Sequence, residues 1–397
     1  MRKLPRKHLI LFATGWIAAL CVMIYWRMEY VRSHDPLQIA FVPSSNGYGT
    51  EIDRMAFSPD GHRIIAEDVG QSLSVWDIRK RQWALWLNKK RSQTPEYQSL
   101  AEPQFPKQYY GRYSGVYFPP DIPNFPPPKP IHKDTPDHLF SLSNDDFQTF
   151  SDLSASRKLI AYGYGNGILS VANIPRKRVL FATPSSHVES FPDGGGVYAD
   201  TLCGLCFSPD EKLLATVSIH NDVSDYLSQR SSSDSIPGPD LQIALRDPHT
   251  GAVIRNWTWK HFRERWTDTV GGNTTPVTMT FSPDSRTLAI ASETQVRLWN
   301  TATGISTRTL YDGNGTFKWT HRLVFFPHRP LLASSGWSGR LQIWNTQSGR
   351  LVQVFQAQPE NYYGLEVAVS PDEKLIANSG RTEKGTAMLQ IWDVSKL

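Results

Sequence analysis

Residues 277–310 read VTMTFSPDSRTLAIASETQVRLWNTATGISTRTL, and this stretch decides the fold. Apolar residues alternate with threonines as far as Phe281, which is typical of a strand with one buried face. Ser282-Pro283-Asp284 is a tight turn, because proline fixes φ and aspartate accepts hydrogen bonds from the backbone ahead of it. Three more short strands follow, over 287–292, 295–299 and 305–310. A four-stranded sheet of this size cannot bury both faces alone, so it must pack between similar neighbours.

The turn and the end of the third strand recur along the chain. The phrase Phe-Ser-Pro-Asp stands at 57–60, 207–210 and 281–284, with degraded copies at 325–328 and 370–372. Trp followed by Asp or Asn comes 16 to 21 residues after the proline of most copies, at 76–77, 299–300, 344–345 and 392–393. Pro283, Pro327 and Pro371 are each 44 residues apart. A period of this length predicts a β-propeller with four strands to a blade.

These segments resemble WD40 repeats, strongly over 277–397 and more weakly over 39–276. Six blades are visible, and they begin near Phe57, Leu153, Phe207, Phe281, Phe325 and Val369. A seventh blade is an alternative within 88–146, where Tyr-Phe-Pro-Pro-Asp at 117–121 echoes the phrase without a following Trp-Asp strand. We interpret 88–146 as an insertion. The fold class is therefore all-β, a WD40-like propeller of six or seven four-stranded blades.

The family pattern is not fully kept. The resemblance implies a Gly-His pair before the first strand and a turn Asp before the Trp strand, which together hydrogen-bond that Trp. No Gly-His occurs at those places, Ser338 stands where the turn Asp is expected, and Ala172 and Arg246 replace Trp in two units. We therefore expect the polar network to be altered, whereas the apolar stacking between blades, the larger energetic contribution, is retained.

The two ends of the propeller predict how the ring closes. The last blade has no fourth strand after Asp393, and residues 37–42 read as an orphan strand just before the first blade. In WD40 proteins such an N-terminal strand completes the final sheet, which removes two free sheet edges. The resemblance thus implies that 37–42 pairs with the last blade and that the propeller occupies 37–397.

The N-terminal region predicts a membrane anchor. Residues 9–26 carry no charge, and about 20 apolar residues span a bilayer as a helix. Because four cations precede this run, the positive-inside rule makes 1–8 a basic cytoplasmic tail, 9–26 a transmembrane helix and 27–36 a linker, with the propeller on the exported side. A cleaved signal peptide, a lipoprotein anchored at Cys21 and a buried core helix remain alternatives.

The charge balance argues against a nucleic-acid partner. The sequence pI is about 9.0 and the formal net charge is +5. Arg2, Lys3, Arg6 and Lys7 supply +4 of it, which leaves +1 for residues 8–397. A nucleic-acid-binding domain concentrates base on its folded surface, so no nucleic-acid partner is expected.

The chain carries no specific catalytic motif. It has no Gly-x-Ser-x-Gly, no His-Glu-x-x-His, no phosphate loop and no Gly-x-Gly-x-x-Gly. Cys203 and Cys206 have redox-like spacing, but we expect them on an inner strand, pointing to opposite faces as two buried hydrophobes. We therefore predict no enzyme activity, no cofactor and no metal. A propeller enzyme or small-molecule binder that uses the central channel remains the alternative.

Extra length is confined to one face of the predicted disc. In a WD40-like blade the first-to-second and third-to-fourth strand turns lie on one face, here called the turn face. The other connections lie on the opposite face, here called the loop face. The turn-face connections are uniformly short, whereas the long segments belong to the loop face: 88–146, 182–200, 220–240, 258–275, 311–320 and 380–387. Loop length on a rigid scaffold is typical of binding surfaces.

The longest segment, 88–146, is rich in proline and aromatic residues, with 11 of the chain's 28 prolines between 95 and 136. It is either an ordered cap on the propeller or a partner-binding arm. The candidate partner-binding residues are Tyr109, Tyr110, Tyr113, Tyr117, Phe118 and Trp337. The sequence predicts a membrane-tethered, non-catalytic scaffold that binds a protein through its loop face. Because the strand at 37–42 starts at the turn face about ten residues after Trp26, we expect that face to look toward the membrane.

Overall fold

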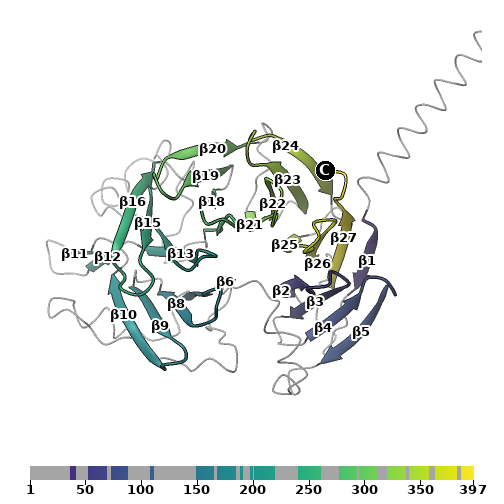
Figure 1. The fold of residues 1–397 in the computed structure, drawn as a ribbon, viewed down its shortest axis with the longest axis horizontal. Coiled ribbons are helices and arrows are strands. Elements are labelled where there is room, and N and C mark those ends of the chain that lie inside the picture. Colours follow the sequence, from purple (N-terminus) through teal and green to yellow (C-terminus); the bar gives the residue numbers. More distant parts are fainter. Residues whose placement is uncertain are drawn as a thin grey trace, which may run out of the picture.

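The computed structural model describes residues 36–41, 52–68, 73–87, 108–110, 149–164, 168–184, 188–190, 197–199, 201–219, 240–260, 277–292, 295–311, 320–336, 339–356, 363–381 and 386–397. In this part of the chain, six antiparallel sheets stand around a central channel (Figure 1), each containing an up-and-down meander of four strands that runs outward from the channel. The prediction of an all-β propeller with blades near the six expected positions is confirmed.

The strands of the six blades follow one another in chain order. Blade 1 comprises β2 (Ile52–Phe57), β3 (Arg63–Asp68), β4 (Leu73–Asp77) and β5 (Gln82–Leu87). Blade 2 comprises β7 (Thr149–Leu153), β8 (Leu159–Tyr164), β9 (Ile168–Asn173) and β10 (Arg178–Pro184). Blade 3 comprises β13 (Thr201–Phe207), β14 (Leu214–Ile219), β15 (Leu241–Arg246) and β16 (Val253–Trp259). Blade 4 comprises β17 (Met279–Phe281), β18 (Thr287–Ala291), β19 (Val296–Asn300) and β20 (Ser306–Leu310). Blade 5 comprises β21 (Thr320–Phe325), β22 (Leu331–Gly336), β23 (Arg340–Asn345) and β24 (Leu351–Gln356). Blade 6 comprises β25 (Tyr363–Val369), β26 (Leu375–Arg381), β27 (Ala387–Asp393) and β1 (Gln38–Phe41).

The predicted pairing of the N-terminal strand with the last blade is confirmed. β1 pairs antiparallel with β27, with Gln38 opposite Ile391, and so forms the outer strand of the last blade. The side chain of Gln38 also reaches blade 1, where its Oε1 accepts a hydrogen bond from Trp76 Nε1 at 2.8 Å and its Nε2 donates to the Ile78 carbonyl at 2.9 Å. The N-terminal strand therefore joins the last blade to the first.

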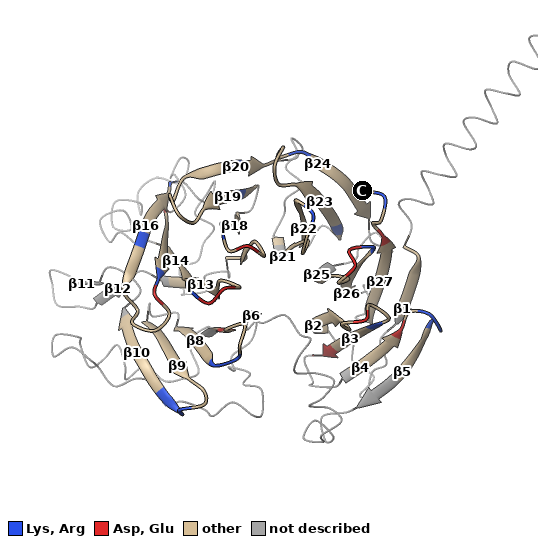
Figure 2. Ribbon diagram, in the orientation of Figure 1, with Lys and Arg blue, Asp and Glu red and all other residues tan. Residues whose placement is uncertain are grey.

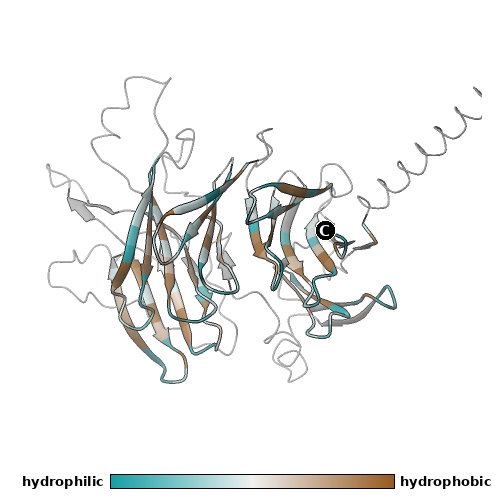
Figure 3. Ribbon diagram, turned by 45° about the horizontal axis from the view of Figure 1, so that its top comes forward, coloured by the Kyte–Doolittle hydropathy of each residue, from teal (hydrophilic) through white to brown (hydrophobic). Residues whose placement is uncertain are grey.

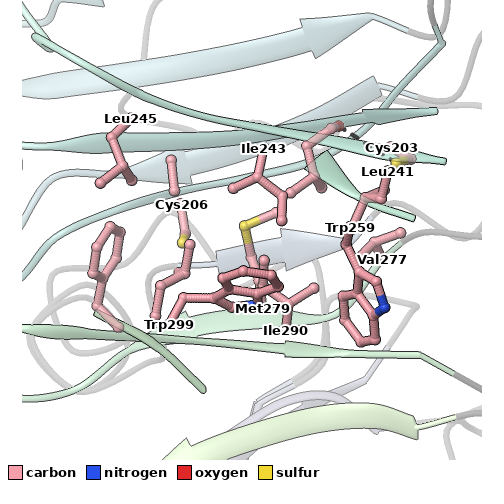
Figure 4. Packing of buried hydrophobic residues seen from close by; sticks show 14 of the residues in the cluster. Cys203, Cys206, Leu241, Ile243, Leu245, Trp259, Val277, Met279, Ile290 and Trp299 are labelled. Atoms are coloured by element: carbon pink, nitrogen blue, oxygen red, sulfur yellow. Dashed lines mark hydrogen bonds between the residues drawn. The ribbon is translucent and has the colours of Figure 1, made fainter. Parts of the chain in front are cut away.

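Neighbouring blades pack through clusters of buried apolar side chains, which Figure 3 shows as apolar bands along the strands. The cluster between blades 3 and 4 includes Met279, Trp259 and Trp299 (Figure 4). Comparable clusters lie between blades 2 and 3, 4 and 5, 5 and 6, and 6 and 1. In blade 2, a further cluster of Leu153, Ile160, Tyr162 and Ala172 consists of that blade's own residues. Within the described residues, no apolar cluster joins blade 1 to blade 2, the two blades that 88–146 connects in sequence.

Part of the long insertion pairs with the propeller. β6 (Gln108–Tyr110) runs antiparallel to β7, with Tyr109 opposite Ser151, and extends blade 2 to five strands on its channel side. A second small addition lies within 182–200, where β11 (Val188–Ser190) pairs with β12 (Val197–Ala199). Residues 108–110 therefore agree with the interpretation of 88–146 as a cap more closely than with a separate arm.

The expectation that Cys203 and Cys206 point to opposite faces is wrong. Both side chains are buried in the cluster between blades 3 and 4 (Figure 4). The register between β13 and β14 shifts between Leu202 and Gly204. This irregularity adds one residue to the alternation of side chains and brings both thiols to the same side. Their assignment as small buried hydrophobes is consistent with this packing.

The structure describes no helix that is both long and apolar enough to cross a bilayer, within the ranges given above. The tail 1–8, the apolar run 9–26 and the linker as far as residue 35 lie outside those ranges.

Candidate interaction site

The inner strands of all six blades line one central channel of about 500 Å³. Its wall is mostly apolar, with side chains such as Phe57, Phe207, Phe281 and Phe325, and the ionisable residues that line it are Asp152 and Arg322. In the alternative function, a propeller enzyme or small-molecule binder, this channel would hold the ligand.

Both ionisable side chains of the channel hold blades together. The buried Asp152 carboxylate accepts hydrogen bonds from the backbone N–H of Leu153 at 2.9 Å and of Phe207, in the next blade, at 2.7 Å. Arg322 of blade 5 pairs with Glu366 of blade 6, with 3.2 Å between Nε and Oε2. Within the described residues, no group of three or more His, Cys, Asp or Glu side chains gathers as metal ligands. The described channel is thus an apolar passage with interblade polar links.

The turn face carries a repeated hydrogen-bonded turn. Ser282 Oγ donates to Asp284 Oδ1 at 2.6 Å and accepts from the Thr287 N–H at 2.9 Å. The same arrangement recurs at Ser58-Asp60, Ser208-Asp210 and Ser370-Asp372. The serine hydroxyl is the largest influence on the pKa of Asp284, and it lowers that pKa because a hydrogen bond stabilises the charged carboxylate.

The residue after this aspartate links consecutive blades. Glu211 and Ser285 both adopt positive φ there, and each side chain reaches back to the turn of the preceding blade. Glu211 accepts from the N–H and the hydroxyl of Ser156, and Ser285 Oγ accepts from the Asp210 N–H at 3.2 Å. The inner circle of the turn face is therefore a chain of interblade hydrogen bonds.

The strongest of these links is formed by Arg329 and Glu373. The guanidinium Nε donates to Glu373 Oε2 at 2.9 Å, and Nη1 donates to the carbonyl oxygens of Val394 and Leu397, both at 3.1 Å. Partial burial raises the pKa of Glu373, but hydrogen bonds from His328 and Arg329 outweigh it, so the pKa is lowered overall. Arg329 thus fastens blade 5 to the turn of blade 6 and to the C-terminal residues.

The altered Trp network is rebuilt from other residues. In blade 5, Trp344 Nε1 donates to Ser334 Oγ on the neighbouring strand at 3.1 Å. In blade 3, Arg246 stands at the position of this Trp. Its Nε donates to Thr216 Oγ1 at 3.4 Å, and Thr216 occupies the position that corresponds to Ser334. Burial lowers the pKa of Arg246. The replacement noticed in the sequence therefore preserves the link between the second and third strands.

The residues predicted to bind a partner fall largely outside the described part. Tyr109 and Tyr110 lie in β6, where only the backbone is described. Tyr113, Tyr117, Phe118 and Trp337 lie outside the described residues, so the structure does not bring the six candidates together as one site. The turn face carries two basic segments, 79–81 and 176–178, which are visible in the sequence as charge runs.

Comparisons with known proteins agree with the repeat pattern. Residues 265–300 match the family described as WD domain, G-beta repeat. The chain is 25% identical over 198 residues to periodic tryptophan protein 2 of Arabidopsis thaliana, an alignment covering 46% of this chain and 21% of that protein. The chain therefore matches about a fifth of the relative's length. A chain of the crystal structure of the mitotic checkpoint complex aligns over 91% of this chain and 92% of its own length, at 15% identity and a TM-score of 0.43. The matched repeat, the recurrent turn and the six meander sheets make this chain similar to proteins of the WD40 repeat family.

Proposed function

We propose that this protein is a non-catalytic interaction scaffold: a WD40 propeller, tethered to a membrane through 9–26, that binds a protein partner through its loop face. WD40 propellers generally serve as interaction scaffolds rather than enzymes. The observation that carries the proposal is the chemical character of the channel lining. Its lining is mainly apolar, and its two ionisable residues, Asp152 and Arg322, are engaged between blades.

The placement of the partner on the loop face is supported by the lengths of the connections between strands. The turn-face connections are short and are tied together by interblade hydrogen bonds, which leaves little adaptable backbone there. The long segments belong to the other face. A rigid ring that presents variable segments on one side is a common arrangement for recognition.

Membrane tethering is supported by the apolar run 9–26 and the four cations before it. Fusion of alkaline phosphatase and of green fluorescent protein to the C-terminus tests the orientation. We expect phosphatase activity and no fluorescence. Fluorescence without phosphatase activity would place the propeller in the cytoplasm, and a mature N-terminus near residue 27 would replace the anchor by a cleaved signal.

Partner binding is tested by capture of the tagged full-length protein from solubilised membranes. One variant replaces 95–136 by a short Gly-Ser link, and a second replaces only 112–136 and so keeps β6. If Tyr113, Tyr117 and Phe118 form the site, both variants lose the partner. The matched control is Gln347→Ala on the turn face, which should capture the partner fully. Equal capture by both loop variants, with melting temperatures unchanged, contradicts a site within this segment.

A further inference from the structure

The outer circle of the turn face carries excess positive charge. It consists of the third-to-fourth strand turns and the residues after β27: 78–81, 174–177, 247–252, 301–305, 346–350 and 394–397. These outer turns contain seven Lys and Arg and one Asp, whereas the inner turns, between first and second strands, contain six Lys and Arg and six Asp and Glu. The expectation that basic residues are concentrated on the N-terminal tail is therefore incomplete. The net charge of +1 over residues 8–397 includes these basic outer turns, whose charge is offset by acidic residues elsewhere.

The charge is densest on two blades. Blade 1 carries Arg79-Lys80-Arg81 between β4 and β5, and blade 2 carries Arg176-Lys177-Arg178 at the start of β10, where Figure 2 shows blue segments. All six side chains are exposed. In the part of the chain that the structure describes, none of the six forms an ion pair with a carboxylate. Arg79 contacts His62 instead, at 2.5 Å between Nη2 and Nε2. These two triads are available to an anionic partner.

The backbone at these triads is strained in a way that the other blades avoid. In each outer turn of blades 3, 4 and 5, the residue four positions after the Asp or Asn at 247, 300 or 345 has positive φ, and it is Gly251, Gly304 or Gly349. At the same position blades 1 and 2 place Arg81, with φ 53°, and Lys177, with φ 47°. A side chain in this region costs roughly 1–2 kcal/mol relative to the right-handed form. Strained positions that persist in a structure are candidates for function, and here both hold a cation.

On blades 3 to 6, the outer circle of the turn face carries exposed aliphatic side chains. Of the eight large hydrophobic residues that are exposed within the described ranges, seven lie at or next to the turn-face end of a fourth strand. They are Val253 and Ile254 of blade 3, Ile305 of blade 4, Leu351 and Val352 of blade 5, and Leu37 and Ile39 of blade 6, with exposed fractions from 36% to 64%. Single exposed hydrophobics are ordinary, but a row along one rim marks an interaction surface.

The chain enters the propeller at this rim. Leu37 donates its N–H to the Ile391 carbonyl at 2.7 Å, at the end of β27 that leads to the turn face. Ten residues separate Trp26 from Leu37, and a span of ten residues reaches at most about 36 Å. With 9–26 in a bilayer, as proposed above, the rim lies within reach of the lipid surface at high effective concentration.

The geometry points to a docking surface for an anionic lipid bilayer, formed by the two basic triads and the aliphatic rim of the turn face. Basic side chains beside exposed aliphatic ones are the composition of surfaces that lie in a membrane interface. Nucleic acid is the less suitable ligand. Proteins that bind single-stranded nucleic acid stack its bases on aromatic side chains, whereas the seven exposed rim residues are aliphatic. The inference deepens the proposed tethering and gives the propeller a defined orientation.

The full-length protein is reconstituted into nanodiscs of phosphatidylcholine alone or mixed with phosphatidylglycerol. A fluorophore at Ser348→Cys, an exposed position in the outer turn of blade 5, reports contact through quenching by nitroxide-labelled lipids, with the unsubstituted protein as the labelling background. We expect stronger quenching in anionic discs, reduced by added salt because exposed charges are screened. Equal quenching in neutral and anionic discs overturns the proposal.

The decisive variant is Arg81→Gly with Lys177→Gly. Each cation near an anionic surface contributes about fivefold to partitioning, the equivalent of about 1 kcal/mol, so the ratio of docked to undocked propeller in anionic discs, measured by nitroxide quenching at Ser348→Cys, should fall by up to about 25-fold. Because glycine accepts positive φ, the melting temperature should stay the same or rise, which excludes misfolding as the cause. The matched control is Lys374→Gln on the inner circle, with little change expected. Unchanged quenching of the double variant in anionic discs overturns the proposal.

Two other results are distinguishable. If the protein fails to co-elute even with neutral discs, the anchor proposal fails. Flotation of the same full-length chain with anionic vesicles then tests whether the rim binds lipid, because no anchor holds the protein on the vesicle. If quenching of the triad variant in anionic discs is unchanged but the variant loses retention of a DNA duplex that the unsubstituted protein retains, the rim is a nucleic-acid surface and the lipid proposal is wrong.

Discussion

Gln38 and Trp76 are joined by a hydrogen bond of 2.8 Å, although they lie in different blades. Gln38 belongs to the strand that completes the last sheet, and Trp76 is the penultimate residue of β4, the third strand of the first sheet. The same side chain donates to Ile78. One amide therefore supports the junction at which the first and last blades of the ring meet.

Replacing Gln38 by Ala should weaken this junction. The Trp76 indole N–H and the Ile78 carbonyl lose their partner, and each lost hydrogen bond of this kind costs about 1 kcal/mol. We expect a loss of about 2 kcal/mol in the free energy of unfolding, measured with denaturant. Ile39→Thr, at the exposed neighbouring position, is the control and should change stability by no more than about 0.5 kcal/mol. A Gln38→Ala protein as stable as the control would contradict the role assigned to this amide.

Replacing Arg329 by Ala should destabilise the junction of blades 5 and 6. The change removes the pairing with Glu373 and the contacts to Val394 and Leu397, and it leaves a largely buried carboxylate without its main partner. We expect a cost of about 2 kcal/mol. Lys374→Ala is the comparison, because its contact with Asp372 at 3.5 Å is exposed and should matter little. Similar unfolding midpoints for the two variants would count against the clamp.

The Ser-Pro-Asp turns predict a loss of stability in acid. The serine hydroxyl lowers the pKa of Asp60, Asp284 and Asp372 in the folded protein. A carboxyl whose folded pKa is depressed adds stability above its unfolded pKa of about 3.9, and this contribution disappears as pH falls through the folded value. Melting temperature should therefore be level near neutral pH and decline below about pH 4. Ser282→Ala should make that decline shallower, whereas Ser395→Ala should follow the unsubstituted curve.

Two buried tryptophans in corresponding positions should respond differently to replacement by Phe. Trp344 donates to Ser334, whereas Trp299 Nε1 has no hydrogen-bond partner among the described residues. Trp344→Phe leaves the Ser334 hydroxyl without that donor, so it should cost about 1 kcal/mol more than Trp299→Phe. Thermal unfolding of the two variants checks the order, and a larger loss for Trp299→Phe would reverse the assignment.

Much of the fold follows from the sequence, because each blade is specified locally. The period-two alternation places one face of a strand inside, and Ser282-Pro283-Asp284 encodes its turn through hydrogen bonds spanning five residues. The missing last strand and the orphan strand around Gln38 likewise predicted the closure. Of the six candidate binding residues, four lie outside the described residues and two, Tyr109 and Tyr110, have only their backbone described.

Other features depend on contacts between residues far apart in the chain, which no local pattern reveals. An added residue in the register of β13 brings Cys203 and Cys206 to one side. Ser156 and Glu211, which are 55 residues apart in the sequence, form a hydrogen bond between neighbouring blades. The sequence by itself determined the repeat, the turns and the closure, because these are short-range or periodic. Only the tertiary structure decided that Arg81 and Lys177 share a circle with the aliphatic rim, because ring closure, not sequence distance, brings the ends of separate blades together.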